Sequence, residues 1–227
     1  MSIPYRLMFD VYGEPYPFAT NGEKQWKQDL MGQIPQKNSQ SKELGAILSF
    51  EYNPILHNNL LDIDNICEPV FSILINNKGW FGGQRPNMQW YRATKKQGSK
   101  SGCNIEMVER NPIEIISEKG ILFDKTFIGT FPNSATDQFF SSWVEKGLEG
   151  RLENNDHCVV QLQFGSAAVN LGAIATGTTK PIIDCLFPVL GGTPGDPDDD
   201  RINTLQVEKG IKEIPLDGVR IFVAKLE

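Results

Sequence analysis

The feature that most constrains the fold is an internal repeat, because residues 1–112 and 113–227 carry similar short segments in the same order. The matching segments are Leu7–Asp10 with Ile121–Asp124, Ile47–Glu51 with Gln161–Phe164, Glu68–Leu74 with Lys180–Leu186, and Ile105–Met107 with Ile221–Val223. The separation within a pair varies only from 112 to 116 residues, as small loop insertions would produce. Such self-similarity indicates that one structural unit occurs twice. We therefore predict two domains, residues 1–112 and 113–227, that form a pseudo-dimer within one chain.

Each copy predicts the same succession of elements, with apolar residues alternating in the strands. The expected strands are 5–12, 46–53, 88–95 and 103–109 in the first copy and 119–128, 157–165, 202–208 and 218–226 in the second. Helices are expected near Glu23–Gln33 and Gln138–Leu148, and two more should begin at Pro69 and Pro181, because proline is favoured in a first turn. Strands on both sides of a helix favour a mixed sheet with helices packed on it. The predicted fold class is α+β: two tandem copies of a mixed β-sheet unit, arranged as a pseudo-twofold dimer.

The composition is that of a globular protein, with 40% hydrophobic and 22% charged residues. No segment approaches the ~20 apolar residues that cross a bilayer, so we expect no membrane partner. The N-terminal run MSIPYRLMFD contains a charge and a proline, which is unlike a signal peptide. Four widely spaced cysteines and only two histidines argue against a zinc site. We expect a cytoplasmic protein with reduced thiols.

The net charge of −6 is unevenly distributed along the chain. Residues 1–110 contain 12 Lys or Arg and 11 Asp or Glu, whereas the remainder contains 10 and 17. The candidate nucleic-acid-binding residues of the first copy are Arg85, Arg92, Lys95, Lys96 and Lys100. Basic runs attract phosphate backbones, so branched or duplex DNA should prefer the first copy, although a charged hairpin would look the same. The acidic second copy could instead dock onto a basic protein partner.

The sharpest local feature is the acidic sequence Asp62-Ile63-Asp64-Asn65, just before Pro69. In an extended segment, residues i and i+2 project to the same face, so the two carboxylates could converge on one cation. Mg²⁺ is commonly held by one or two carboxylates together with water and phosphate oxygens. The alternative is that Asp and Asn serve as a helix N-cap signal.

The run D-I-D-N-I-C-E-P-V-F-S-I-L, which follows an alternating strand and precedes G-W-F, resembles the RusA-type Holliday-junction resolvases. That resemblance implies a Mg²⁺-dependent endonuclease of four-way DNA junctions, in which aspartates and a lysine serve phosphodiester cleavage. These resolvases are homodimers, and each copy of this chain corresponds to about one subunit. The resemblance therefore implies a monomer that acts as a pseudo-dimer.

Each copy retains a different part of the resolvase pattern. Asp62 and Asp64 match its first acid pair, but Glu68 stands at its lysine and Gly83-Gln84 at its second acid pair. In the second copy, Ile174 and Thr176 replace the first acid pair, whereas Lys180, Asp184 and the pair Asp198-Asp199 are retained. The implied catalytic residues are Asp62, Asp64, Asp199 and Lys180. The implied ligands of Mg²⁺ (or Mn²⁺) are Asp62, Asp64, Asp198 and Asp199.

Two interpretations of this partition remain open. The retained groups could meet across the pseudo-twofold axis and form one composite active site. Alternatively, catalysis has been lost, and the scaffold binds nucleic acid or a protein partner. A short distance between the carboxylates of Asp64 and Asp199 would favour the first interpretation. Two further features are equally open: the Asp196–Asp200 run is a cation-binding loop or a solvated turn, and Trp80 stacks on a base or lies in the core.

Overall fold

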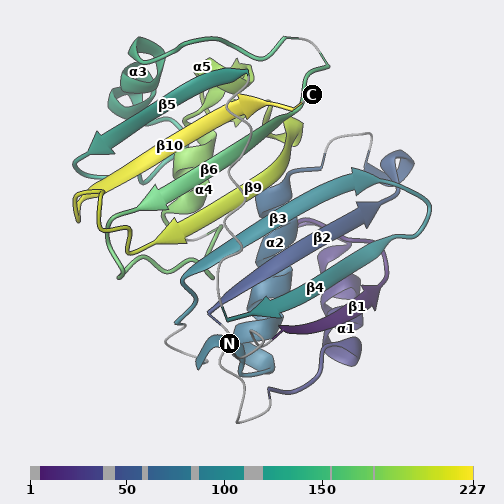
Figure 1. Cartoon of the computed structure of the whole chain (residues 1–227). Coiled ribbons are helices and arrows are strands. Elements are labelled where there is room, and N and C mark those ends of the chain that lie inside the picture. Colours follow the sequence, from purple (N-terminus) through teal and green to yellow (C-terminus); the bar gives the residue numbers. More distant parts are fainter. Residues whose placement is uncertain are drawn as a thin grey trace.

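A computed structural model describes residues 6–37, 44–57, 61–82, 87–109, 120–153, 155–175 and 177–226. Within these ranges, eight strands form one mixed sheet, and the helices lie on one of its faces (Figure 1). The α+β class and the mixed sheet are thus confirmed. The predicted domain boundary between residues 112 and 113 lies outside the described residues. The same holds for Arg85, one of the predicted nucleic-acid-binding residues.

The first part of the chain, residues 6–109, contains both predicted helices. Its elements are β1 (Arg6–Tyr12), α1 (Glu23–Gln33), β2 (Gly45–Tyr52), η1 (Pro54–His57), α2 (Ile63–Ser72), the π-helical η2 (Ile73–Asn77), η3 (Trp80–Gly82), β3 (Trp90–Gln97) and β4 (Gly102–Val108). The predicted start of α2 at Pro69 is wrong, since the helix begins at Ile63 and contains Pro69. Proline inside a helix leaves a carbonyl without its usual N–H donor. Here the carbonyl of Asn65 accepts a hydrogen bond from the Phe18 N–H instead, at 3.0 Å.

The second part, residues 120–226, contains a shorter equivalent of each predicted helix. Its elements are β5 (Ile121–Ile128), α3 (Gln138–Lys146), β6 (Cys158–Phe164), α4 (Thr179–Asp184), α5 (Phe187–Leu190), β7 (Gly192–Thr193), β8 (Asp196–Pro197), η4 (Asp199–Arg201), β9 (Ile202–Lys209) and β10 (Gly218–Lys225). Pro181 lies in the first turn of α4, as the sequence predicted. The strands β7 and β8 form a separate small hairpin.

The order of strands in the large sheet is β1-β4-β2-β3-β9-β6-β10-β5. The pairs β2·β3 and β6·β9 are parallel, and the other neighbouring pairs are antiparallel. The two parts of the chain join through the antiparallel pair β3·β9, in which Arg92 lies opposite Gln206. The sheet is therefore continuous across the middle of the molecule (Figure 1).

One hydrophobic core, made by residues of both parts, fills the space between the sheet and the helices. Trp80 belongs to it: its ring is buried and its Nε1 donates to the Pro35 carbonyl at 3.0 Å, so it is a core residue rather than a stacking platform. The cysteines are free and buried, at positions 67, 103, 158 and 185. Among the described helices, none combines the length and apolar character required to cross a membrane.

Candidate active site

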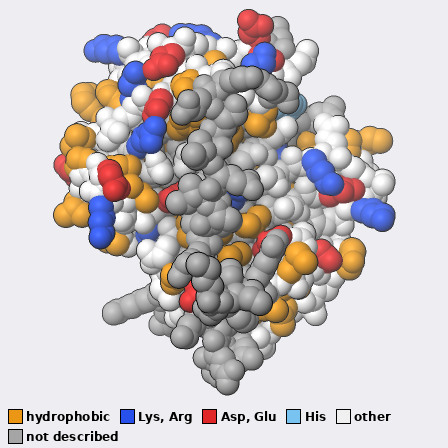
Figure 2. All heavy atoms as spheres, in the orientation of Figure 1, with side chains coloured by type: hydrophobic (Ala, Val, Ile, Leu, Met, Phe, Trp, Pro, Cys, Tyr) orange, Lys and Arg blue, Asp and Glu red, His pale blue; other side chains and the backbone are white. Residues whose placement is uncertain are grey.

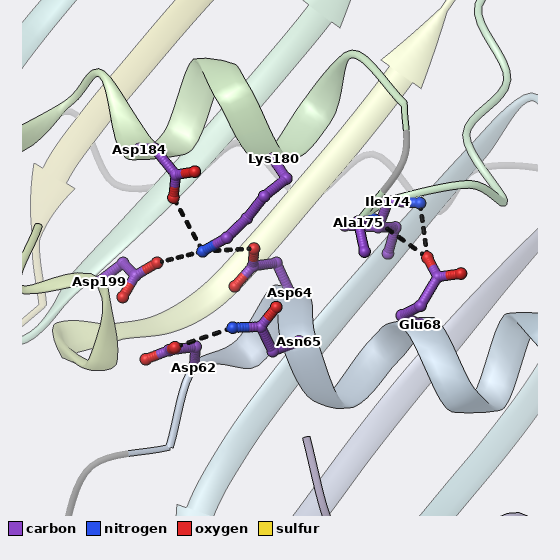
Figure 3. A network of polar contacts seen from close by, with 9 residues as sticks. All are labelled: Asp62, Asp64, Asn65, Glu68, Ile174, Ala175, Lys180, Asp184 and Asp199. Atoms are coloured by element: carbon purple, nitrogen blue, oxygen red, sulfur yellow. Dashed lines mark hydrogen bonds and ion pairs between the residues drawn. The ribbon is translucent and has the colours of Figure 1, made fainter. Parts of the chain in front are cut away.

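Lys180 is the centre of a cluster of charged side chains between α2 and α4. Its Nζ lies 3.2 Å from Oδ2 of Asp64, 2.8 Å from Oδ1 of Asp184 and 2.8 Å from Oδ2 of Asp199 (Figure 3). Asp64 comes from the first part of the chain, whereas the other two carboxylates come from the second. The structure therefore brings together the acid from one part and the lysine and acid from the other.

Asp62 and Asp64 lie at the start of α2, and their geometry differs from the predicted extended segment. Asp62 is the extended N-cap residue, but Asp64 already belongs to the first helical turn. The side chain of Asp62 makes no capping hydrogen bond, and its Oδ2 accepts one from the Asn65 amide at 2.9 Å (Figure 3). The two carboxylates still interact, since the charge of Asp62 contributes to raising the pKa of Asp64. The two carboxylates lie close together because the chain turns sharply where it enters the helix. They do not project from one face of an extended segment, as predicted.

The carboxylate of Asp64 is fully buried, and among the described residues neither of its oxygens accepts a hydrogen bond. Its contact is the ion pair with Lys180. Burial raises the pKa of Asp64, and the nearby Asp62 and Asp184 carboxylates add to the rise against the opposing effect of Lys180. A buried charge without hydrogen bonds is costly. This carboxylate can therefore accept a further cation or a proton.

The surroundings of Asp199 raise its pKa, as those of Asp64 do. Its burial, together with the carboxylates of Asp64 and Asp62, raises its pKa to about 8 in spite of the adjacent ammonium of Lys180. Although burial alone would lower the pKa of Lys180, the carboxylates of Asp64, Asp199 and Asp184 raise it above its ordinary value. Negative charge in the cluster exceeds what one lysine balances. Perturbed titration of this kind is frequent at functional sites.

Lys95 connects the segment that carries Asp62 with the segment that carries Asp199, and it does so from the interior of the protein. Its predicted role at a DNA surface is wrong. The side chain is only 5% exposed, and its Nζ donates to the carbonyls of Leu61 and Asp200, the latter at 2.5 Å. Those carbonyls immediately precede Asp62 and follow Asp199. Burial lowers the pKa of Lys95, and the surrounding aspartates oppose that effect. Lys95 therefore holds the two aspartate-bearing segments together from the interior of the protein.

The other predicted basic residues do not form one patch with the cluster. Successive residues of a strand face opposite sides of a sheet, so Arg92 and Lys96 lie on the face opposite to that of Lys95. Arg92 donates to Oε1 of Gln206 at 3.2 and 3.0 Å. The exposed Lys96 forms an ion pair with Glu51 at 3.3 Å, and Lys100 is also exposed. Positive and negative side chains are interspersed on this face (Figure 2).

The geometry suits a small divalent cation only in part. The Oδ2 of Asp198 lies 3.9 Å from Nη1 of Arg201, whereas the ion pairs of Lys180 are with Asp64, Asp184 and Asp199, so the part of Asp198 in metal binding stays a prediction. Within the described ranges, no group of three or more His, Cys, Asp or Glu residues is arranged to hold a metal ion. Asp64 and Asp199 nevertheless approach the same Nζ, so their Oδ2 atoms are no more than about 6 Å apart. Two carboxylates with water and phosphate oxygens are a common set of ligands for Mg²⁺.

Glu68 makes a second contact between the two parts. It does not join Asp62 and Asp64. Instead, its Oε2 accepts hydrogen bonds from the backbone N–H groups of Ile174 at 2.7 Å and Ala175 at 3.1 Å (Figure 3). The acid that stands at the predicted lysine position therefore fixes the loop that leads into α4.

Two members of the cluster were not predicted as catalytic residues or metal ligands. Asp184 was matched only as a retained residue of the resolvase pattern, and it lies four residues after Lys180 on α4, a spacing that places side chains together on a helix. Lys95 was predicted to bind nucleic acid. The role of Lys95 depends on the sheet register and had no such signal. A surface cavity of about 460 Å³ along α1, lined by Lys24, Lys27 and neighbouring residues, shares no residue with the cluster.

Comparison with known proteins does not place the chain in a family. No protein-family model matches it, and no curated protein matches it. A solved structure titled "Cyanuric acid hydrolase: evolutionary innovation by structural concatenation" aligns with all of this chain and 69% of its own, at 12% identity and a TM-score of 0.25. So low a score carries no argument about fold or function.

The predicted membership of the RusA-type resolvases is wrong, since no family model and no curated protein matches the chain. The resemblance rested on a run of about a dozen residues in which the lysine position is already occupied by Glu68. Short acidic motifs before a helix arise readily, because Asp and Asn are favoured at helix starts. The cluster must therefore be interpreted from its own geometry.

Proposed function

We propose that this chain is a divalent-metal-dependent hydrolase of phosphodiester bonds in nucleic acid, with a single composite active site. The observation that carries the proposal is the convergence of Asp64 and Asp199 on Lys180. Asp64 is more than a hundred positions away from Lys180 and Asp199 in the sequence, and its buried carboxylate has no partner other than Lys180 among the described residues. Together they supply ligands for a hard cation and a positive charge for a phosphate.

Asp64 and Asp199 would hold Mg²⁺ or Mn²⁺, with the half-buried Asp62 beside them. Once bound, such an ion lowers the pKa of a coordinated water and stabilises a leaving oxygen. The residues suit the ion because the buried Asp64 carboxylate has no partner other than Lys180 among the described residues, and other carboxylates lie near it. Lys180 is 21% exposed in its side chain, so its ammonium can turn from the acids to a non-bridging phosphate oxygen.

The proposed reaction is hydrolysis of a phosphodiester. The oxygen of water attacks phosphorus, and the bond from phosphorus to one bridging oxygen breaks. One water proton is released to solvent, and the leaving oxygen takes up a proton to become a hydroxyl. The products are a phosphomonoester and that hydroxyl, so no oxidant or further reactant is required.

The proposal has a second part: the chain is a duplicated unit folded about a pseudo-twofold axis, and the composite site lies between the two copies. Strand order supports it: from one edge inward the sheet runs β1, β4, β2, β3, and from the other edge β5, β10, β6, β9. Each pair has the same direction as its counterpart, including the parallel pairs β2·β3 and β6·β9. An isologous contact joins a surface to its own copy, as β3·β9 would do here.

Strand registers support the same axis. If Leu48 is equivalent to Leu162, the parallel pairings make Arg92 equivalent to Gln206. These two residues are direct partners in β3·β9, and a residue paired with its own equivalent lies on a twofold axis. The flanking pairs, Tyr91 with Val207 and Ala93 with Leu205, are then exchanged by the rotation. The three registers of β2·β3, β6·β9 and β3·β9 thus agree with one twofold axis.

Two further pairs of residues support equivalence. Gly13 and Gly129 follow β1 and β5 with φ of 137° and 138°, and their N–H groups donate to the carbonyls before β4 and β10. Lys95 on β3 and Lys209 on β9, 114 residues apart, are both buried and donate to loop carbonyls. Matching backbone conformation and matching buried charges are difficult to explain without common ancestry of the two parts.

The second candidate function is a catalytically inactive module in which the cluster only fastens the two parts together. The specific observation in its favour is that Lys180 already occupies the centre of the carboxylates. On that proposal, nucleic acid would be held by the exposed Lys96 and Lys100, or the acidic second part would bind a basic protein in the cytoplasm.

Nuclease assays separate the two candidates. Labelled duplex and branched DNA, incubated with Mg²⁺ or Mn²⁺, should be cut by the unaltered protein and left intact by Asp64→Asn. The matched control is Asp196→Asn, which changes an exposed acid close to Asp199 in sequence and should retain full activity. Substrates that remain intact over a broad range of metals and pH would refute catalysis. Binding that persists in that case would support the inactive module.

A further inference from the structure

The exposed face of α1 carries a groove of about 460 Å³ that is basic at one end and apolar at the other. Its α1 side chains are spaced at i, i+3, i+4 and i+7, so they form one stripe along the helix: Lys24, Lys27, Gln28 and Met31. Lys27 forms an ion pair with Glu23 at 2.5 Å. Lys24 is exposed, and within the described ranges no acid forms an ion pair with it. Met31 is 40% exposed.

The equivalent face of α3 is hollowed in the same way but lies beside a further segment of the chain. The buried Trp26 and Leu30 of α1 correspond to Phe140 and Val144 of α3, at the offset of 114 residues that also relates β2 to β6. The stripe on α1 then corresponds to α3 residues that line a smaller cavity of about 180 Å³: Gln138, Ser141, Ser142 and Glu145. The two helices lie at opposite ends of the molecule (Figure 1).

The segment beside α3 indicates what kind of chain fits such a face. Phe187 of α5 and Pro194 in the turn of the β7·β8 hairpin form the other wall of the smaller cavity. This segment, FPVLGGTPGDPDDD, is apolar at its start and acidic at its end. Across the groove on α1, by contrast, Ile73 is the one described residue that lines it from another helix. The wall that α5 and the hairpin supply in the second part is therefore missing from the described residues of the first part.

The chemistry of the α1 face favours an acidic partner more strongly than that of the α3 face. Lys24 stands at the position of Gln138, and Lys27 at that of Ser141. At the far end of the stripe, Met31 stands where α3 has an acid, Glu145. A segment that is apolar at one end and acidic at the other would therefore find complementary groups at both ends of the groove on α1.

We propose that this groove binds an apolar and acidic peptide segment of a partner protein. Apolar side chains of the partner lie on Met31 and Ile73, and its carboxylates lie next to the ammonium groups of Lys24 and Lys27. Opposite charges across an interface speed association and select the partner. From Lys24 to Met31 the stripe is about 11 Å long, which about four residues of an extended chain can follow. The proposal rests on the duplication and not on the proposed hydrolysis, so the two can fail separately.

A synthetic peptide with the sequence of residues 187–200 is a suitable probe, because it combines the apolar and acidic parts in the order found beside α3. Fluorescence anisotropy of the labelled peptide, titrated with the full-length protein at physiological salt, should show saturable binding. A second peptide, in which every aspartate is replaced by asparagine, should bind about tenfold more weakly. Equal affinity for the two peptides, or no saturable binding of the acidic one, would overturn the proposal.

Substitutions in the protein locate the binding. Lys24→Glu should weaken binding of the acidic peptide by about tenfold, and Met31→Gln should also weaken it. Both side chains are exposed, so urea unfolding of both variants should stay native. Lys146→Glu, at the exposed end of α3, is the matched control and should bind like the unaltered protein. A Lys24→Glu variant that binds as tightly as the unaltered protein would place the peptide elsewhere and contradict the proposal.

Sedimentation of the protein without peptide tests the other occupant, a second copy of this chain. The expected result is a monomer at all concentrations, for the unaltered protein and for Lys24→Glu. Self-association that rises with concentration and is lost in Lys24→Glu would show that a second copy fills the groove, and it would overturn the assignment to a different protein.

Discussion

Asp199→Asn is the substitution that best tests the electrostatics of the cluster. Asp199 is buried beside Asp64, and its pKa is raised from 3.8 to about 8. Asparagine has nearly the same shape but never carries the negative charge. Near neutral pH the folded protein must keep a proton on Asp199 that the unfolded chain releases, so a residue that never ionises should stabilise the folded protein there.

The sign and size of the effect follow from proton linkage. Between pH 4 and 8, the folded state holds a proton on Asp199 that the unfolded chain has released. The folded state then binds more protons than the unfolded state, so the free energy of unfolding falls as pH rises. One proton corresponds to about 1.4 kcal/mol per pH unit. The unaltered protein should therefore lose on the order of 2–3 kcal/mol between pH 5 and pH 7 that the Asp199→Asn variant retains.

Urea unfolding at pH 5, 6, 7 and 8, followed by circular dichroism and by tryptophan fluorescence, gives the required curves. The difference between the variant and the unaltered protein should grow steadily with pH, and Asp196→Asn should follow the unaltered protein throughout. Parallel curves for Asp199→Asn and the unaltered protein would refute the reasoning, since Asp199 would then be ionised across the whole range. Addition of Mn²⁺ should stabilise the unaltered protein and not the variant, because a ligand that binds only the folded state stabilises it.

Three other substitutions and one binding measurement probe the same cluster. Lys180→Met should lower the free energy of unfolding by about 3–5 kcal/mol, because it leaves buried carboxylates without a partner, whereas Lys212→Met on the surface should change little in the same urea titration. Lys95→Met should cost about 2–4 kcal/mol, since two buried carbonyls lose their donor, and nuclease activity should fall with it. Glu68→Ala should increase amide hydrogen exchange at Ile174 and Ala175, while Glu68→Gln, which retains an acceptor oxygen, should not. Calorimetric titration with Mn²⁺ at pH 7, in buffers of different ionisation enthalpy, should register release of up to one proton per ion bound, and the absence of any buffer dependence would contradict a protonated Asp199.

Much of the fold could be predicted from periodicity, because the apolar faces of these elements are regular. The helix around Trp26 was predicted with its observed ends, Glu23 and Gln33, and Trp26 is fully buried. Strand β2 alternates between the core and the open face of the sheet, which is the pattern that identified it. Where a segment buries one face, its sequence pattern follows its geometry closely.

Under the proposed duplication, the residue-by-residue matches predicted from the sequence agree less well with the sheet registers than does the order of the elements. The sequence match aligned Phe9 with Phe123, whereas the sheet registers make Phe9 equivalent to Lys125. Ile105 pairs with Phe9, and its equivalent Ile221 pairs with Lys125. Edge strands touch only one neighbour, so their apolar residues can shift by two positions without exchanging faces. The conformation of Gly13 and Gly129 locates the equivalence better than the apolar residues do.

Adjacent charged residues of the predicted sites point in different directions for a common reason. Lys95 and Lys96 are adjacent in a basic run, but a strand sends one to the core and the other to the surface. Similarly, Asp198 and Asp199 are adjacent, yet only Asp199 faces Lys180. A run of like charges does not show whether each side chain points to the core or to the surface. The place of each residue in a strand or at the start of a helix decides that. The convergence of Asp64 with Lys180 also required the order in which β3 and β9 pair, which no local pattern contains.

The balance of charges in the cluster bears on whether it is only a structural contact between the two parts of the chain or an active site. A cluster selected only to join two halves would approach neutrality, because an uncompensated buried charge costs several kcal/mol. Here two lysines, Lys95 and Lys180, lie among five carboxylates, and Asp64 has no partner other than Lys180 among the described residues. The equivalent place around Glu68 is satisfied by two backbone N–H groups and already fastens the halves. The cluster around Lys180, whose carboxylates are incompletely balanced, is thus the one that retains both a lysine and acids. That is expected if a bound cation balances the remaining negative charge.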